Sequence, residues 1–160
     1  MATTFFKGGP LDSEFLTAAP AVISVNDRPA LAFDAATDEN AYWSDTCPQG
    51  FTGTATCIVS YIMASATTGS VRFQAAIEAV TDADATDLDA TTSFDTANSA
   101  GDTVPGTAGY LGQFSITMTN QDSLTAGDYF RLRLNRDADG TSGTDDASGD
   151  CYVLAVEMQY

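Results

Sequence analysis

The chain has 160 residues, with 22 acidic side chains against six basic ones, no histidine and a formal net charge of −16. This length suits one domain around a single core, and 44% hydrophobic residues are too many for a disordered chain. The charge argues against nucleic acid and anionic membranes as partners, because phosphate binding depends on Lys and Arg.

The first nineteen residues are expected to form an extended arm, followed by a folded body over residues 20–160. The apolar side chains of the arm come in two pairs, separated by Gly-Gly-Pro: Phe5, Phe6, Phe15 and Leu16. Such an arm packs against its own domain or adds a strand to the sheet edge of a neighbouring subunit. Two adjacent phenylalanines are unfavourable in water, so a contact with a neighbour is a serious alternative to a partly ordered tail.

Alternation of apolar and polar residues dominates the body and predicts about eight β-strands. In the 70–80 segment, for example, Val71 and Phe73 fall on one face and Arg72 and Gln74 on the other. The predicted strands span residues 20–25, 29–34, 40–45, 54–64, 70–80, 112–120, 129–136 and 151–160. The 81–109 segment has no apolar stripe that a helix could bury, and we expect a loop with one short edge strand near Phe94.

Eight or so antiparallel strands with long connections predict an all-β, two-sheet antiparallel sandwich. A jelly roll is the favoured topology, and an immunoglobulin-like Greek key is the alternative. A parallel α/β fold would need crossover helices, which the connecting segments do not supply. No apolar run approaches the length of a membrane span, so none is expected.

The stretch RDADGTSGTDDASGD, residues 136–150, is either a calcium loop or a solvated turn. Four of its side chains are candidate calcium ligands: Asp137, Asp139, Asp145 and Asp146. Calcium prefers oxygen ligands at such alternate spacing, but Ser142 and Ser148 stand where an EF-hand loop has glycine and a bidentate glutamate. The sequence therefore favours a structural turn, with weak calcium binding as the alternative and no other cofactor expected.

The absence of histidine excludes mechanisms that use a Ser-His or Cys-His pair or a histidine metal ligand. The single lysine, Lys7, excludes an ordinary phosphate loop. Paired carboxylates for glycoside hydrolysis remain conceivable, but the acidic residues lie mostly in polar loops. Glu78 and Glu157, the two that fall within predicted strands, are expected to be solvated. The sequence thus indicates a protein without enzymatic activity.

The three cysteines allow one easy disulfide, between Cys47 and Cys57, which flank a short loop between adjacent predicted strands. The alternative is that these two and Cys151 are small buried hydrophobic residues.

Two further groups suggest binding surfaces. Arg131 and Arg133, with Arg72 if the strands are neighbours, form a basic stripe on which acidic loops of another subunit would dock. The alternative is that these arginines only increase solubility. The aromatic residues suggest a sugar-binding platform, although aromatics in a sandwich are more often core: Tyr42, Trp43, Phe51, Tyr61, Tyr110 and Tyr129.

The segments RPALAFDAATDENAYW (residues 28–43) and GDYFRLRLNRDADGT…GDCYVLAVEMQY (residues 127–160) resemble small jelly-roll structural proteins of phage and metagenomic origin, similar to protomers of extracellular or virion filaments. This resemblance implies an extracellular or virion-surface building block without catalytic residues.

Together, these observations predict a structural protomer that binds copies of itself through the N-terminal arm and sheet edges. Phe5, Phe6, Phe15, Leu16, Arg131 and Arg133 are the expected contact residues. Open fibres or closed rings would result from such head-to-tail contacts. The alternative function is a carbohydrate-binding or receptor-binding β-sandwich with glycans as partners.

Overall fold

The computed structural model describes residues 1–14 and 16–160, and the expected contact residue Phe15 lies outside this part. Apart from one short 3-10 helix, Pro10–Asp12, the regular structure is entirely β. The strands are β1 (Thr4–Gly8), β2 (Ala21–Val25), β3 (Arg28–Phe33), β4 (Asn40–Thr46), β5 (Thr56–Met63), β6 (Ser70–Val80), β7 (Asn98–Thr103), β8 (Gly112–Thr117), β9 (Tyr129–Arg136) and β10 (Cys151–Gln159). No helix in the described part of the chain is long and apolar enough to cross a membrane.

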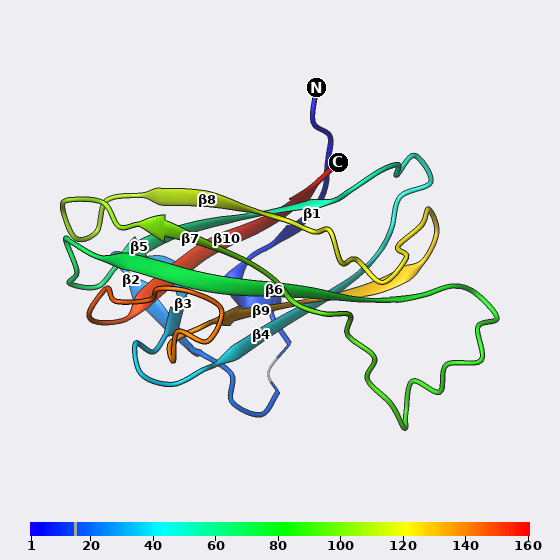
Figure 1. Cartoon of the computed structure of the whole chain (residues 1–160), viewed down its shortest axis with the longest axis horizontal. Helices are drawn as coiled ribbons and strands as arrows, with labels where there is room; N and C mark the ends of the chain where they lie inside the picture. Colours follow the sequence, from blue (N-terminus) through cyan, green and yellow to red (C-terminus); the bar gives the residue numbers. More distant parts are fainter. Residues whose placement is uncertain (15) are drawn as a thin grey trace.

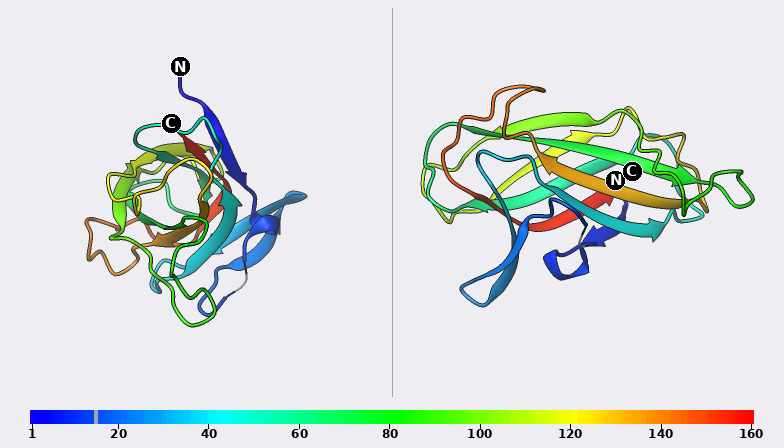
Figure 2. Two further views of the ribbon diagram at one scale, coloured as in Figure 1. Left: turned by 90° about the vertical axis from the view of Figure 1, so that its right-hand side faces the viewer. Right: turned by 90° about the horizontal axis from the view of Figure 1, so that it is seen from below.

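The strands form two antiparallel sheets that face each other, as the sequence predicted (Figures 1 and 2). The six-stranded sheet has the order β2-β3-β10-β5-β8, with β1 also pairing with β10. The four-stranded sheet has the order β4-β9-β6-β7. The architecture is the jelly-roll sandwich that the sequence favoured. The alternation of apolar and polar residues explains it, because each sheet buries its apolar face against the other sheet.

The core lies between the sheets and is filled by the apolar half of each alternating strand. In β6 the side chains of Val71, Phe73 and Ile77 are buried, while Arg72 and Gln74 lie on the opposite face. The ring of Phe73 meets that of Phe33 from the other sheet, with centroids 5.3 Å apart in an edge-to-face arrangement. Such pairs stabilise the contact beyond the area they bury.

The N-terminal segment is not a free arm. Strand β1 pairs with the last strand, with Lys7 opposite Glu157, so the segment adds to its own six-stranded sheet. The ring of Phe6 is buried against Phe130 (centroids 5.9 Å), and that of Phe5 packs against Phe51 (5.4 Å). Phe5 and Phe6, both expected at a contact with a neighbour, therefore pack against the core of their own subunit, because β1 pairs with an edge of β10 in the same chain.

The long 81–109 segment contains a loop and one short edge strand, as predicted, but the strand lies later in the chain than expected. Its edge strand is β7, which begins at Asn98, four residues after Phe94. The preceding residues 81–97 form a loop that projects from the end of β6 (Figure 1, green). Phe94 itself lies over the outer face of the four-stranded sheet, as described below.

Candidate functional site

The outer face of the four-stranded sheet carries the chemically varied side chains. On β9 the residues Tyr129, Arg131 and Arg133 alternate with buried ones and face outward. Arg131 lies directly between Ser44 of β4 and Glu78 of β6 in the antiparallel register. This register places one arginine at the centre of three strands.

Arg131 is held between two glutamates. Its Nη2 donates to Glu14 Oε2 at 2.9 Å, and its Nη1 lies 3.5 Å from Glu78 Oε2. Glu14 is fixed beside β4, because its backbone N–H donates to the carbonyl of Tyr42 (2.8 Å) and its carboxylate accepts from the hydroxyl of Ser44. Burial alone would lower the pKa of Arg131, but the hydrogen bond and the charges of both glutamates raise it above its ordinary value. The arginine is thus permanently charged.

Glu78 differs from its expected solvated state, since only 1% of the residue is exposed. Its Oε1 accepts from the backbone N–H of Ser93 at 2.6 Å, so the returning part of the 81–97 loop is attached to the sheet through this carboxylate. A second attachment is the backbone bond from Asp95 N–H to the carbonyl of Ile77 at 2.9 Å. The burial of Glu78 could not be predicted from the sequence, because the sequence does not show that the 81–97 loop returns over β6.

Aromatic rings complete one side of the site. The guanidinium of Arg131 lies 5.3 Å from the ring centre of Tyr42 and 5.5 Å from that of Phe94, and Arg133 lies 5.2 Å from Phe94. These cation–π contacts, with the Tyr42–Phe94 ring pair at 5.8 Å, keep Phe94 on the outer face of the sheet. The basic stripe expected to bind another subunit is therefore occupied in part by aromatic residues of its own chain.

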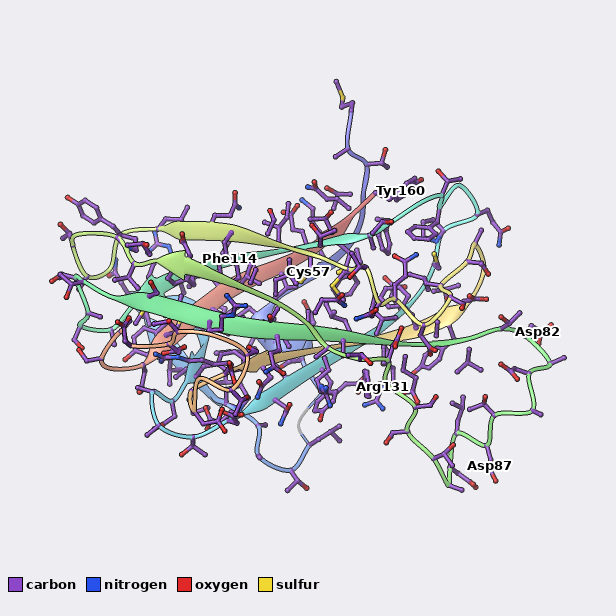
Figure 3. The ribbon with its side chains drawn as sticks, in the orientation of Figure 1. Cys57, Asp82, Asp87, Phe114, Arg131 and Tyr160 are labelled. Carbon is purple, nitrogen blue, oxygen red and sulfur yellow. The ribbon has the colours of Figure 1, made fainter. Side chains whose placement is uncertain are left out.

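Two adjoining hollows open beside this row, and we call them together the Tyr129 groove. The first has a volume of about 220 Å³ and is lined by Glu14, Glu78, Leu88, Thr91, Tyr129 and Arg131. The second has a volume of about 360 Å³, and among the residues that line it are Thr46, Thr81, Asp82, Leu88 and Tyr129. Figure 3 shows Arg131 near the base of the loop and Asp87 on its projecting part. The groove thus lies between the sheet and the 81–97 loop.

The groove presents an aromatic surface beside a row of hydrogen-bonding groups, in which Glu14 and Arg131 are partly exposed and Glu78 is buried. A carboxylate only accepts and a guanidinium only donates, so Glu14, Arg131 and Glu78 alternate acceptor, donor and acceptor. A hydroxyl group does both, and neighbouring hydroxyl groups suit such a row. Tyr129 is 38% exposed, and with Leu88 it supplies an apolar wall. The arrangement suits a compound that carries several hydroxyl groups on an apolar ring.

The expected aromatic platform is only partly present. Trp43 is 2% exposed, and its indole N–H donates to the carbonyl of Gly9 at 3.0 Å, so it is a core residue. Phe51 and Tyr61 are also buried, whereas Tyr110 and Tyr129 are exposed. The sequence could not separate buried from exposed aromatic residues, because the polarity of a side chain alone does not show which way it faces.

The four candidate calcium ligands do not converge. Asp137 is buried, and its two oxygens accept four hydrogen bonds, from the backbone N–H and the hydroxyl of both Thr141 and Ser142 (2.6 to 3.2 Å). A smaller acidic cluster does form: one carboxylate oxygen from each of Asp38, Asp137 and Asp139 lies within 4.8 Å of the others. Asp38 was not among the calcium ligands predicted from the sequence.

The other two candidates bind elsewhere in the fold. Asp145 forms a bidentate ion pair with the buried Arg136, at 2.7 and 3.0 Å, and Asp146 accepts from the backbone N–H of Ser70 at 2.7 Å. Two of the four predicted calcium ligands, Asp145 and Asp146, therefore bind groups of the protein, whereas Asp137 and Asp139 lie in the acidic cluster with Asp38.

The cysteines are free thiols in the structure, and all three are buried. Burial and the nearby charge of Asp128 raise the pKa of Cys47 to about 11, and burial raises that of Cys57 to about 12. The structure thus has the alternative arrangement of buried thiols rather than the Cys47–Cys57 bridge.

No protein-family model matches this sequence, and no curated protein matches it either. Several solved structures with a similar fold are carbohydrate-binding modules. One is the family 6 module from the C-terminus of LamC, a laminarinase of Zobellia galactanivorans, with a TM-score of 0.52 and 13% identity over 99% of this chain and 100% of that one. Another is a family 36 module in complex with calcium and xylotriose, with a TM-score of 0.50 and 16% identity over 96% of this chain and 99% of that one. At these identities the similarity establishes the fold.

These findings overturn the leading hypothesis of a filament or virion protomer. The two similar structures described above are carbohydrate-binding modules, not filament protomers. Within the arm that was expected to link subunits, residues Thr4–Gly8 form a strand of its own sheet, so this part of the arm is not free to pair with a neighbouring subunit.

Proposed function

We propose that this chain is a non-catalytic carbohydrate-binding module that binds uncharged glycans in the Tyr129 groove. The observation that carries the proposal is the Glu14–Arg131–Glu78 row beside the exposed ring of Tyr129 on a jelly-roll sandwich. Similarity to two carbohydrate-binding modules supports the class, and the alternating donors and acceptors support a polyhydroxylated ligand.

The environment of the two glutamates supports binding without hydrolysis. A glycosidase needs a carboxylic acid in apolar surroundings that can donate its proton to the leaving oxygen. Glu14 and Glu78 both bind the same guanidinium, and Glu78 also accepts from a backbone N–H. Both side chains are thus engaged in contacts within the protein, which supports recognition rather than acid catalysis as the role of the groove. Because its ligands would be polysaccharides, we also place the protein outside the cell.

A titration of neutral oligosaccharides by isothermal titration calorimetry tests the proposal, with xylotriose among the probes after a glycan-array screen. Replacing Tyr129 with alanine should weaken binding at least about tenfold, equivalent to about 1.4 kcal/mol, because the ring forms the shared wall of both hollows. Tyr110→Ala is the matched control, since Tyr110 is 65% exposed and lies outside the groove. Equal affinities of wild type and Tyr129→Ala would contradict the proposal, as would an equal loss in the control.

A further inference from the structure

A separate hollow lies at the opposite end of the same sheet face. Its volume is about 230 Å³, and it is lined by Ser70, Arg72, Gly101, Asp102, Thr103 and Thr144. Arg72 and Glu78 are six positions apart along β6, which is about 20 Å at about 3.3 Å per residue. Figure 1 shows the two ends: the green 81–97 loop extends beyond one end of β6, and the orange 137–150 loop lies at the other. We call this second cavity the Arg72 hollow.

The side chain of Arg72 packs against the backbone of two glycines, Gly101 and Gly143. A Cβ atom on Gly101 of β7 would lie 3.3 Å from Arg72 Cδ, and one on Gly143 would lie 2.7 Å from Cζ. Side chains at these positions would displace the guanidinium, so both backbones pack directly against it. Its Nη2 also donates to Ser99 Oγ at 2.9 Å. The group is therefore held in a single arrangement.

The guanidinium of Arg72 has no carboxylate within 4.0 Å in the described part of the chain, in contrast to the guanidinium groups of Arg131 and Arg136. Its Nε is buried without a hydrogen-bond partner. Immobilising an arginine side chain loses rotamer entropy, and no ion pair with another described residue offsets that loss at Arg72. A guanidinium has five N–H donors, and the hydrogen bond to Ser99 uses one donor of the Arg72 group, which lines the hollow. Donors held in place before a ligand arrives are typical of a binding site.

The 137–150 loop supplies part of the wall of this hollow, and two of its aspartates attach the loop to β6. Asp145 Oδ2 accepts from the backbone N–H of Arg72 at 2.8 Å, and Asp146 Oδ1 accepts from that of Ser70 at 2.7 Å. The backbone N–H of Asp137 donates to the carbonyl of Arg72 at 2.9 Å. These bonds fasten the loop along the first residues of β6, and they bring Gly143 and Thr144 beside the guanidinium.

The surroundings select an uncharged ligand. Three hydroxyl residues, Ser70, Thr103 and Thr144, line the hollow beside Arg72, and they can both donate and accept. An anion is disfavoured, because Asp102 also lines the hollow and the whole chain carries a formal charge of −16. A volume of about 230 Å³ is roughly seven to eight times that of a water molecule in the liquid, enough for one small ring.

We propose that the Arg72 hollow is a second binding site, which takes an uncharged sugar residue of a glycan. This inference rests on the proposed function for the class of ligand, but it uses different residues at the other end of the sheet. With two sites, one module binds a polysaccharide more tightly than either site alone, because the second contact forms at a high effective concentration.

An NMR titration of the ¹⁵N-labelled protein with xylotriose, cellotriose and mannotriose tests the inference. The reporters are the backbone amides of Ser70, Thr103 and Thr144 and the side-chain Nε–H of Arg72, compared with the amides of Tyr129 and Arg131. Shifts of the first group should persist in Tyr129→Ala. The dissociation constant for this site should rise at least about tenfold in Arg72→Met, equivalent to about 1.4 kcal/mol. Arg28→Met is the matched control, because Arg28 is exposed and its loss changes the net charge equally.

The outcomes separate the two proposals. Shifts around Tyr129 alone would overturn the second site and leave the proposed function intact. Shifts around Arg72 alone would support the second site and overturn binding in the Tyr129 groove. No shift in either group with any of the three sugars would overturn both. Equal or larger shifts around Arg72 with sodium galacturonate would overturn the assignment of an uncharged ligand.

Discussion

Replacing Asp145 with alanine tests how strongly the acidic 137–150 loop is bound to the sandwich. The Arg136 guanidinium is fully buried, and it donates to both oxygens of Asp145 at 2.7 and 3.0 Å and to the carbonyls of Ala147 and Gly149 at 2.9 Å. Removal of the carboxylate leaves a buried charge without its counter-ion, which costs about 3–5 kcal/mol. We therefore expect the free energy of unfolding to fall by that amount.

Urea denaturation followed by tryptophan fluorescence and circular dichroism measures this change. For a chain of this length, the corresponding fall in Tm is about 6–20 °C. Glu157→Gln is the control, because its ion pair with the exposed Lys7 at 3.5 Å should contribute less than about 1 kcal/mol. A loss below about 1 kcal/mol in Asp145→Ala would refute the reasoning that this pair is buried and structurally required.

Three further predictions concern the core and the loop. Trp43→Ala should lower the free energy of unfolding by about 3–5 kcal/mol in urea denaturation, because the indole is buried, and a glycan-specific effect without destabilisation would contradict this. Gly112→Ala should cost about 1–3 kcal/mol in the same assay, since its Cβ would lie 2.5 Å from the ring of Tyr61; unchanged stability would show that the ring moves freely. Burial alone would raise the pKa of Asp137, but hydrogen bonds from Ser142 and Thr141 hold it below its ordinary value. The stability that this carboxylate contributes is then fully present above the unfolded pKa of about 3.9 and is lost as the pH falls through the folded pKa. Asp137→Asn should therefore have a lower free energy of unfolding than the wild type at pH 7, and the difference should shrink in acid. A difference that does not change with pH would contradict this.

Much of the fold could be predicted from alternation. The predicted strand over residues 70–80 coincides with β6, and that over 129–136 coincides with β9. The two strands missing or misplaced, β1 and β7, are short. Strand β7, with the sequence NSAGDT, lacks the apolar alternation of the others, and β1 was set aside because glycines and a proline follow it. Each becomes a strand by pairing with an edge that a longer strand provides.

The candidate site was much less accessible to prediction. Arg131 was identified from the alternation of β9, but its partners Glu14 and Glu78 come from segments 117 and 53 residues away in sequence. Glu78 was interpreted as a solvated strand residue, because nothing local shows that a loop covers it. The sequence predicted either a structural turn or a metal site for the Asp-rich loop. The hydrogen bonds that Asp146 and Asp145 accept from the backbone of Ser70 and Arg72 give these two carboxylates a structural role.

The sequence by itself determined the β-sandwich class, the strand periodicity and the exclusion of histidine chemistry, because these depend on local alternation and on composition. Only the tertiary structure decided that the N-terminal segment joins its own sheet and that Trp43 is core. It also decided which charges meet on the outer face of the four-stranded sheet. The physical reason is that strand register and loop placement are set by contacts between residues far apart in the chain, and a shift of one residue exchanges the two faces of a strand.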